Sequence, residues 1–301
     1  MLPDAAYAAA LVARGVPPTC LRHLLATGSA RAAWARTAPG DREAASEPAE
    51  VAAAWETCAH LGVTVLVVGD EQFPAALTDD PAAPAVLFVR GEPALLGGHP
   101  TVAVVGTRRA TRYGLGVAAQ LGADLSSSGI SVATGVAPGI EGAAHEAAAA
   151  VRRTDLSRSA PTVGVVAGGL DAPHHPSRLR LWETAQGAGL LVSATAVGSA
   201  VPRWRLAQRQ ALLAALADVV VVVECHARGA ALEVARAAAA RGAPIGAVPG
   251  SVRSPASAGA NDLLADGCFA VRDAADVLVA VGLARAGDRP APLSATPGSA
   301  L

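Results

Sequence analysis

Residues 101–151 read TVAVVGTRRATRYGLGVAAQLGADLSSSGISVATGVAPGIEGAAHEAAAAV, and this stretch decides the fold. Two short apolar runs, Val102–Val105 and Ser131–Thr134, each lead into a turn that contains glycine. Alanine-rich segments of helical length follow these turns, at Gly114–Ser127 and at Glu141–Val151. Short apolar strands that alternate with helices are typical of a parallel sheet covered by helices on both faces. The stretch therefore predicts two consecutive strand–helix units.

The same alternation continues to about residue 281. Further strands are predicted at Thr162–Ala167, Leu190–Ser193, Val219–Glu224, Pro244–Val248 and Cys268–Val271. The helices predicted between them are Arg178–Ala188, Ala207–Leu216, Ala230–Arg241 and Gly259–Asp266. The pattern predicts the α/β class, with a doubly wound and mostly parallel sheet.

Changes in composition divide the chain into three parts. Residues 1–59 place alanine and leucine at helical spacing, which predicts a small helical N-terminal domain. Residues 60–284 form the predicted α/β domain, in which 60–99 supply short lead-in strands. Residues 285–301 consist largely of Pro, Ala, Ser and Gly and are predicted to be a disordered tail, because they have little to bury.

The overall composition argues against a membrane or secreted protein. Hydrophobic residues make up 52% of the chain, yet the longest strongly apolar run is Val219–Val223, far below the ~20 residues of a membrane span. No basic stretch precedes an apolar segment at the N-terminus, and the four cysteines form no C-x-x-C pair. We therefore expect a cytoplasmic protein with reduced thiols.

The charge is balanced over the whole chain. The formal net charge is −1, and all 24 basic residues counted as lysine or arginine are arginine. A nucleic acid would have to bind a local basic patch, because there is no global positive field.

The turn after the first strand carries informative residues. Gly106 lets a phosphate approach the backbone, and Thr107 and Arg108 follow it directly. Arg112 precedes the next helix, whose free N–H groups favour an anion. The spacing is not the G-x-G-x-x-G of dinucleotide enzymes, so the turn predicts a general phosphate site.

Three later turns offer similar chemistry. Gly135 and Gly139 flank the turn after the second strand, and Gly168-Gly169 follows the third. Gly250-Ser251 follows a later strand and could present a backbone N–H beside a hydroxyl. The alternative, that these glycines serve only the backbone geometry of strand–helix turns, stays open on the sequence alone.

Catalytic and metal sites find little support in the sequence. His174-His175 has no partner at a metal-binding spacing, which favours two ordinary loop imidazoles. Glu141 and His145 stand one helical turn apart, which predicts a solvated pair and not an acid–base couple. No serine has a G-x-S-x-G setting. We predict no catalytic residue, no metal and no cofactor.

Taken together and in order, these strings resemble the DprA/Smf family of DNA-processing proteins. They are VAVVGTR at 102–108, TGVAPGIE at 134–141, GGLD at 168–171, GLLVS at 189–193 and VPGS at 248–251. The resemblance covers about residues 5–280. It implies a Rossmann-like core that binds single-stranded DNA in a basic pocket, as a homodimer. It also implies a role in DNA recombination and transformation, with a RecA-type recombinase as partner.

The chain also departs from the pattern of that family. The family's FPRRNR segment appears as LAQRQA at 206–211, which keeps Arg209 as its cation. Its SGSLxT turn appears as GAALEV at 229–234, which begins at Gly229 and adds Glu233. We assign Arg209 and Gly229 to the DNA site but expect a pocket with fewer cations than usual. The C-terminal winged-helix module of many members is not expected in this chain.

Two other functions remain open. A related group of nucleotide-processing phosphoribohydrolases uses a G-G-x-G-T-x-x-E turn with a catalytic glutamate, to which 229–233 is loosely similar. A degenerate paralogue that binds a nucleotide or a protein partner is the other. The leading hypothesis is a non-enzymatic single-stranded DNA-binding protein. Its predicted DNA and phosphate contacts are Gly106, Thr107, Arg108, Arg112, Gly135, Gly139, Gly168, Gly169, Arg209, Gly229, Gly250 and Ser251.

Overall fold

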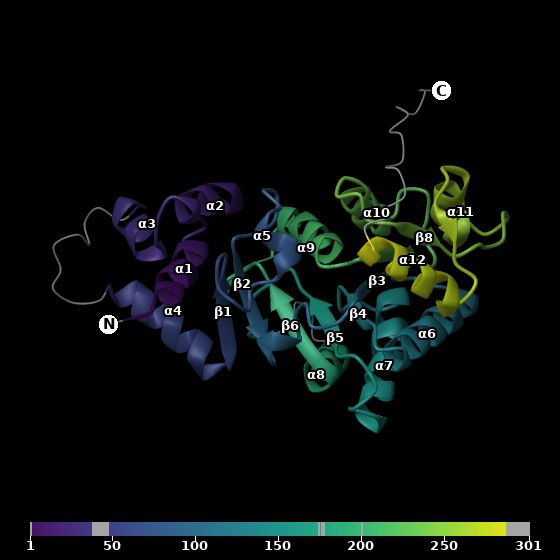
Figure 1. Cartoon of the computed structure of the whole chain (residues 1–301), viewed down its shortest axis with the longest axis horizontal. Helices are drawn as coiled ribbons and strands as arrows, with labels where there is room; N and C mark the ends of the chain where they lie inside the picture. Colours follow the sequence, from purple (N-terminus) through teal and green to yellow (C-terminus); the bar gives the residue numbers. More distant parts are fainter. Residues whose placement is uncertain (1, 38–47, 174, 176–177, 200, 287–301) are drawn as a thin grey trace.

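The computed structural model describes residues 2–37, 48–173, 175, 178–199 and 201–286. Within them a nine-stranded sheet runs through the molecule in the order β1-β2-β6-β5-β4-β3-β7-β8-β9 (Figure 1). The strands are β1 (Val63–Val67), β2 (Val86–Arg90), β3 (Thr101–Val105), β4 (Ser131–Thr134), β5 (Thr162–Val165), β6 (Gly189–Ser193), β7 (Val219–Val222), β8 (Ile245–Ala247) and β9 (Phe269–Ala270).

The strands from β3 to β9 are all parallel, whereas β2 pairs antiparallel with both β1 and β6. From β3 the chain winds in one direction through β4 and β5 to β6. It then returns to the other side of β3 and continues through β7 and β8 to β9. The predicted α/β class with a Rossmann-like, doubly wound sheet is confirmed, and the winding reverses between β3 and β7.

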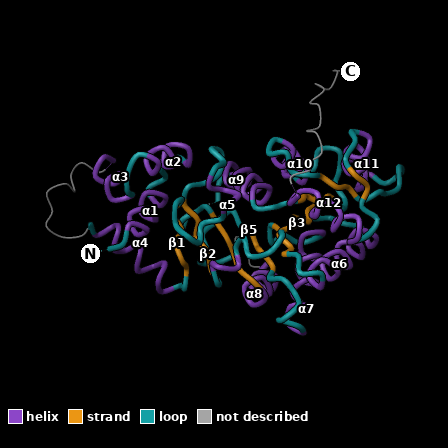
Figure 2. The backbone as a smooth tube through the Cα atoms, in the orientation of Figure 1, coloured by secondary structure: helices purple, strands orange, loops and turns teal. Residues whose placement is uncertain are grey.

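Helices cover both faces of this sheet, as Figure 2 shows (helices purple, strands orange). The helices are α1 (Asp4–Ala13), α2 (Pro18–Ala26), α3 (Ala30–Thr37), α4 (Ala49–His60), α5 (Ala75–Thr78), α6 (Arg112–Ser127), α7 (Ile140–Thr154), α8 (Leu179–Ala188), α9 (Arg203–Ala215), α10 (Ala231–Ala239), α11 (Ala258–Ala265) and α12 (Ala274–Ala286). Helix α12 was not predicted, although Asp273 caps its first turn by accepting hydrogen bonds from two backbone N–H groups. Residues 285 and 286, predicted to belong to a disordered tail, form the end of α12, whereas residues 287–301 lie outside the described residues.

The apolar runs form strands because both of their faces are buried. In β3, Val102 and Val104 pack with α6, α7 and α12 on one face, whereas Ala103 and Val105 pack with α9 and α10 on the other. The four valines of β7 divide between the same two clusters. An alternating polar residue would have been buried on one of these faces, so Val102–Val105 and β7 are apolar throughout, and the polar residue of β3, Thr101, stands at its first position.

The N-terminal helices share a core with the first two strands. Leu11, Trp34 and Val51 join one buried cluster with Val65 of β1 and Phe88 of β2. The N-terminal region therefore covers one end of the sheet with apolar side chains. No described helix combines the length and the apolar character that a membrane span requires.

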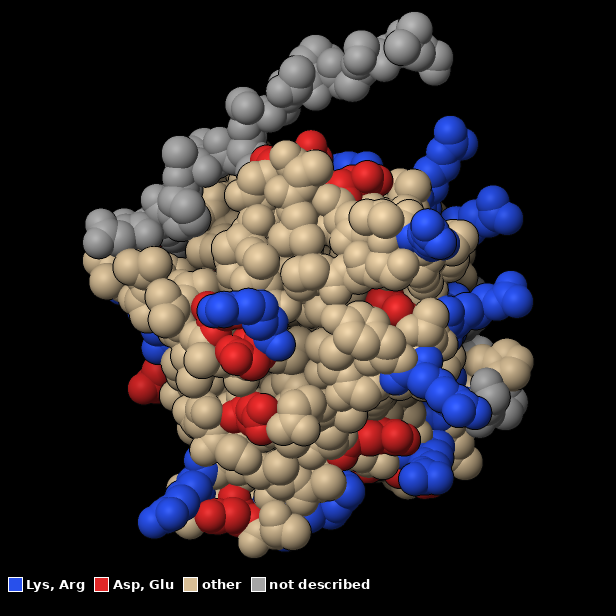
Figure 3. All heavy atoms as spheres, turned by 90° about the vertical axis from the view of Figure 1, so that its right-hand side faces the viewer, with Lys and Arg blue, Asp and Glu red and all other residues tan. Residues whose placement is uncertain are grey.

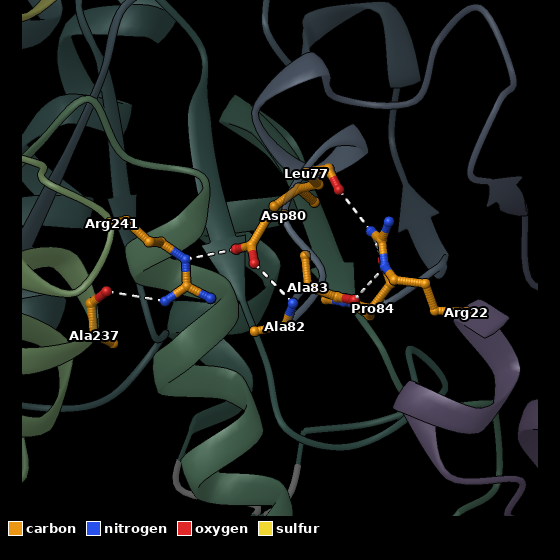
Figure 4. Close-up of polar contacts among 8 residues, drawn as sticks. All are labelled: Arg22, Leu77, Asp80, Ala82, Ala83, Pro84, Ala237 and Arg241. Atoms are coloured by element: carbon orange, nitrogen blue, oxygen red, sulfur yellow. Dashed lines mark hydrogen bonds and ion pairs between the residues drawn. The ribbon is translucent and has the colours of Figure 1, made fainter. Parts of the chain in front are cut away.

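Polar contacts tie this region to the opposite side of the sheet through residues 77–84 (Figure 4). Arg22 of α2 donates hydrogen bonds to the carbonyl oxygens of Leu77 (2.6 Å) and Ala83 (3.0 Å). On the other side of the segment, Asp80 pairs with Arg241 at 2.7 Å, just beyond α10. The segment thus lies between two arginine contacts.

Replacing Arg22 by methionine is expected to lower the free energy of unfolding by about 2 kcal/mol, because part-buried carbonyls lose a charged donor. Urea unfolding monitored by circular dichroism measures this change. Arg36→Met is the matched control, since Arg36 makes one exposed bond of 3.3 Å to Leu24 and should cost less than about 0.5 kcal/mol. Equal losses in the two variants would contradict the assigned role of Arg22.

Candidate nucleic-acid interface

Arginines gather at the carboxyl edge of the parallel sheet, which is where doubly wound folds bind ligands. The segments after four of the strands carry exposed arginines that form no ion pair with any described residue. They are Arg108, Arg109 and Arg112 after β3, Arg203 after β6, Arg228 after β7 and Arg253 after β8. In Figure 3, basic side chains (blue) project along the right-hand margin of the face, and acidic side chains (red) lie in separate patches across it. This edge therefore presents positive charge although the whole chain is nearly neutral.

A cavity of about 380 Å³ opens at this edge beside the ends of β4 and β5. Gly135, Gly168 and Gly169, all predicted as site residues, line it together with Arg178 and Arg209. Burial lowers the pKa of the Arg178 guanidinium, and the positive charges of Arg108 and Arg209 lower it further, against the opposing charge of Glu141. Two further positive charges therefore act on the Arg178 guanidinium, and a bound anion would relieve this repulsion.

Arg209 lies at the inner wall of this cavity and is only 8% exposed. Its guanidinium donates a hydrogen bond of 2.9 Å to the Gly135 carbonyl and lies 3.4 Å from the Glu141 carboxylate. A Cβ at position 135 would overlap that guanidinium, which explains the glycine there. Arg209 is present in the site as predicted, but its charge is shared with Glu141 inside the protein.

The turns after β3 and β4 pack directly on each other. The Ile140 N–H donates to the Thr107 carbonyl at 3.2 Å, and a Cβ on Gly139 would overlap Thr107 and Arg108. Gly139 also has a φ of 86°, which an L residue rarely adopts. The two turns predicted as phosphate sites thus form one continuous surface.

Val136 in the same turn is strained. Its φ of 50° is positive, although β-branched residues rarely adopt such a value. The Val136 N–H donates to the Thr134 hydroxyl at 3.3 Å, and the Val136 side chain is 2% exposed, so its surroundings hold it in place. Backbone strain of this kind gathers at functional sites, and here it borders the cavity.

The crevice between β3 and β7, where the winding reverses, is filled by the chain itself. Glu224, 1% exposed, accepts hydrogen bonds from the Thr111 N–H (2.9 Å) and the Thr111 hydroxyl (2.6 Å) at the start of α6. The Thr107 N–H donates to the Glu224 carbonyl at 2.7 Å, and Gly114 leaves room for the carboxylate. An internal carboxylate therefore takes the place that a nucleotide phosphate occupies in dinucleotide-binding relatives of this fold.

The other predicted residues lie away from the first cavity. Gly250 and Ser251 line a second cavity, and the Gly250 N–H is not free, because it donates to the Asn261 side chain at 3.1 Å. Gly229 lies in the turn between β7 and α10, where a Cβ would overlap the Cys225 sulfur. Of the predicted residues, Gly135, Gly168, Gly169 and Arg209 line the first cavity, whereas Gly250 and Ser251 line the second.

Some expectations from the sequence are corrected. Glu141 and His145 were expected to be solvated, but they are 6% and 0% exposed. His145 packs behind the β4 turn, with its Nδ1 2.9 Å from the Thr134 hydroxyl. Five arginines at this edge were not predicted, because nothing in their local sequence marks them as members of one edge: Arg109, Arg178, Arg203, Arg228 and Arg253.

Metal-binding geometry is not found in the described part of the chain, where no group of three or more His, Cys, Asp or Glu side chains could hold an ion. His174 of the His174-His175 pair lies outside the described residues.

Comparison with known proteins agrees with this geometry. Residues 64–282 match the model of the family described as DNA recombination-mediator protein A. The chain belongs to this family. A Mycobacterium tuberculosis protein that carries the name DNA processing protein DprA is 40% identical over 213 residues, which are 70% of this chain and 53% of that protein. The chain thus spans about half the length of the curated family members it matches first.

Solved structures of family members share the fold. DprA from Streptococcus pneumoniae superposes with a TM-score of 0.66 at 28% identity, over 77% of this chain and 82% of that one. DNA processing protein A from Helicobacter pylori, whose structure is described in terms of its single-stranded DNA binding mode, gives a TM-score of 0.63 at 24% identity. That likeness covers 73% of this chain and 95% of that one, and it shows the shared fold.

Proposed function

We propose that this protein binds single-stranded DNA at the carboxyl edge of its sheet and acts in DNA processing and recombination. Arg178 and Arg209, which line one cavity, carry this proposal together with the positive charge of Arg108, because a bound anion would relieve the repulsion that these charges exert on Arg178. Membership of a recombination-mediator family supports it. The exposed arginines along the edge supply further phosphate contacts, which need no particular base sequence.

The cavity favours a single strand over a duplex. Its wall includes the half-buried Val201 and Leu206 beside the arginines, so it offers an apolar surface to an unpaired base and charge to the neighbouring phosphate. A duplex keeps its bases stacked inside, so it could contact only the arginines and not the apolar wall. We expect tighter binding to single strands than to duplex, with little sequence preference.

The protein is proposed to work without enzymatic activity. Glu233, the nearest equivalent of the catalytic glutamate of the phosphoribohydrolases, is exposed and pairs with Arg236 on its own helix. The crevice between β3 and β7 is filled by Glu224. Release of base from a nucleoside monophosphate, abolished by Glu233→Gln, would favour the enzyme instead.

The remaining expectations form part of the same proposal. A homodimer is supported by the exposed apolar side chains of Val279 and Leu283, one turn apart on α12. A RecA-type recombinase partner and a cytoplasmic location are supported by the family's description as a recombination mediator. A boundary near residue 60 is supported by the family match, which begins at residue 64.

Salt-dependent binding to a single-stranded oligonucleotide tests the proposal. Arg108→Ala is expected to weaken binding and to reduce the log–log salt slope by about 0.7, the value for one phosphate on a single strand. Arg153→Ala is the matched control, because Arg153 is equally exposed but lies at the end of α7, on the opposite edge of the sheet. Fluorescence anisotropy between low and physiological salt measures both slopes. Identical behaviour of the two variants would show that DNA does not bind this edge.

A further inference from the structure

A second cavity, of about 400 Å³, lies farther along the carboxyl edge, where β8 ends beside the start of α6. It is lined by Tyr113, Pro249, Gly250, Ser251, Ser254 and Ser257. Counted along the sheet, β8 lies three strands from β4 and four strands from β5, the two strands whose ends border the first cavity. At about 4.8 Å between neighbouring strands, the two cavities are about 14 to 19 Å apart.

Tyr113 presents a rigid aromatic surface to this second cavity. Its side chain is 52% exposed, although large aromatic rings usually gain stability by burial. The Tyr113 hydroxyl donates a hydrogen bond of 2.8 Å to the Pro249 carbonyl, which holds the ring across the gap between α6 and the β8 loop. The ring is therefore fixed before any ligand binds, so little entropy is lost when a flat group stacks on it.

The loop opposite Tyr113 is also held in place. The Asn261 side chain bonds both the N–H and the carbonyl of Gly250, each at 3.1 Å. A Cβ on Gly250 would overlap the Ser257 hydroxyl, so only glycine allows this packing. The Ser251 and Ser254 hydroxyls remain at the wall of the cavity as hydrogen-bonding groups.

Exposed arginines adjoin the lining residues on both α6 and the loop after β8. Arg112 directly precedes Tyr113, and Arg253 lies between Ser251 and Ser254; both are exposed, and neither pairs with a described acid. Glu224, the acid nearest in the fold to the start of α6, is buried and bonded to Thr111. An aromatic face between two cations and two hydroxyls suits a base together with its adjoining phosphates.

We propose that this cavity is a second subsite for the same single strand, in which one base stacks on Tyr113 while Arg112 and Arg253 neutralise neighbouring phosphates. The inference rests on the proposed function. A strand that leaves the first cavity would pass Arg108 and Arg109 on its way. At about 3.4 Å per stacked nucleotide, a path of about 14 to 19 Å corresponds to about four to six nucleotides, and a more extended strand needs fewer.

Oligonucleotides of two lengths distinguish the two subsites, because only the longer one can reach both. Binding of a 5′-phosphorylated trinucleotide and of an oligothymidine of about 15 nucleotides is measured for the native protein, Tyr113→Ala and Tyr113→Phe. We expect Tyr113→Ala to weaken binding of the long strand by about 5- to 150-fold, the range for one lost stacking contact, and to leave the trinucleotide unaffected. Tyr113→Phe keeps the ring and should bind the long strand nearly as the native protein does.

The salt dependence of binding gives a second test, which concerns Arg253. Arg253→Ala should reduce the salt slope of the long strand by about 0.7 and leave that of the trinucleotide unchanged. Native binding of the long strand by Tyr113→Ala would overturn the second subsite while the proposed function stands. Equal weakening for both lengths, at an unchanged melting temperature, would also overturn it. A native protein that binds neither oligonucleotide would overturn the proposed function itself.

Discussion

Replacing Arg209 by methionine is expected to destabilise the protein by about 3 kcal/mol, because it leaves the Glu141 carboxylate buried without its cation. Both side chains are 8% exposed, so water cannot solvate the remaining charge. The value lies at the lower end of the usual range for breaking a buried pair, since Arg209 also borders an open cavity. Thermal unfolding should show a fall in the melting temperature of roughly 6–12 °C.

The double variant Glu141→Leu with Arg209→Met is the decisive control. Removing both charges takes away the desolvation penalty of the pair, and an apolar replacement of similar volume is often close to neutral. We expect the double variant to regain most of the stability that Arg209→Met loses. If the double variant loses the sum of the stabilities that Arg209→Met and Glu141→Leu lose separately, the two residues do not act as a pair.

Acid should destabilise the protein by about 3 kcal/mol through His145 alone. The side chain is completely buried, and this burial lowers the pKa of the imidazole from 6.5 to about 4. Between these values the unfolded chain binds a proton that the folded protein does not. The contribution of His145 to the free energy of unfolding is therefore fully present above pH 6.5 and is lost as the pH falls from 6.5 to about 4. Below pH 4 this residue causes no further loss. A shift of about 2.5 pKa units at 1.36 kcal/mol each sets the size of the loss.

His145→Gln is the variant that isolates this contribution. Glutamine is neutral at every pH in this range and can still reach a hydrogen-bond partner, while the carboxylates that also titrate here are unchanged. Urea unfolding of both proteins from pH 7.5 to 4 measures the difference in the free energy of unfolding. As the pH falls, the difference in the free energy of unfolding between the native protein and His145→Gln should become smaller, or the variant should become the more stable of the two. Parallel curves would show that His145 accepts its proton equally well when folded.

Most strands and helices of the α/β domain could be predicted from the sequence alone. Strands buried on both faces are mostly continuous apolar runs, so the strands predicted at Val102–Val105 and Val219–Glu224 lie within two residues of their observed bounds, Thr101–Val105 and Val219–Val222. Helices had to follow them, because parallel strands need a crossover connection. The glycine turns at 106, 135 and 168 were also visible, since a strand that leads into a helix through glycine is a local signal.

Only the tertiary structure decided which charges meet. Strand order is not written in the local sequence, and the return of the chain from β6 to β7 brings Glu224 to Thr111, 113 residues away. Packing also turned Arg209 inward onto Glu141, so the cation that the sequence offered to DNA is partly neutralised. The exposed arginines come from separate loops without a motif. They form one site because the carboxyl ends of parallel strands share one edge of the sheet.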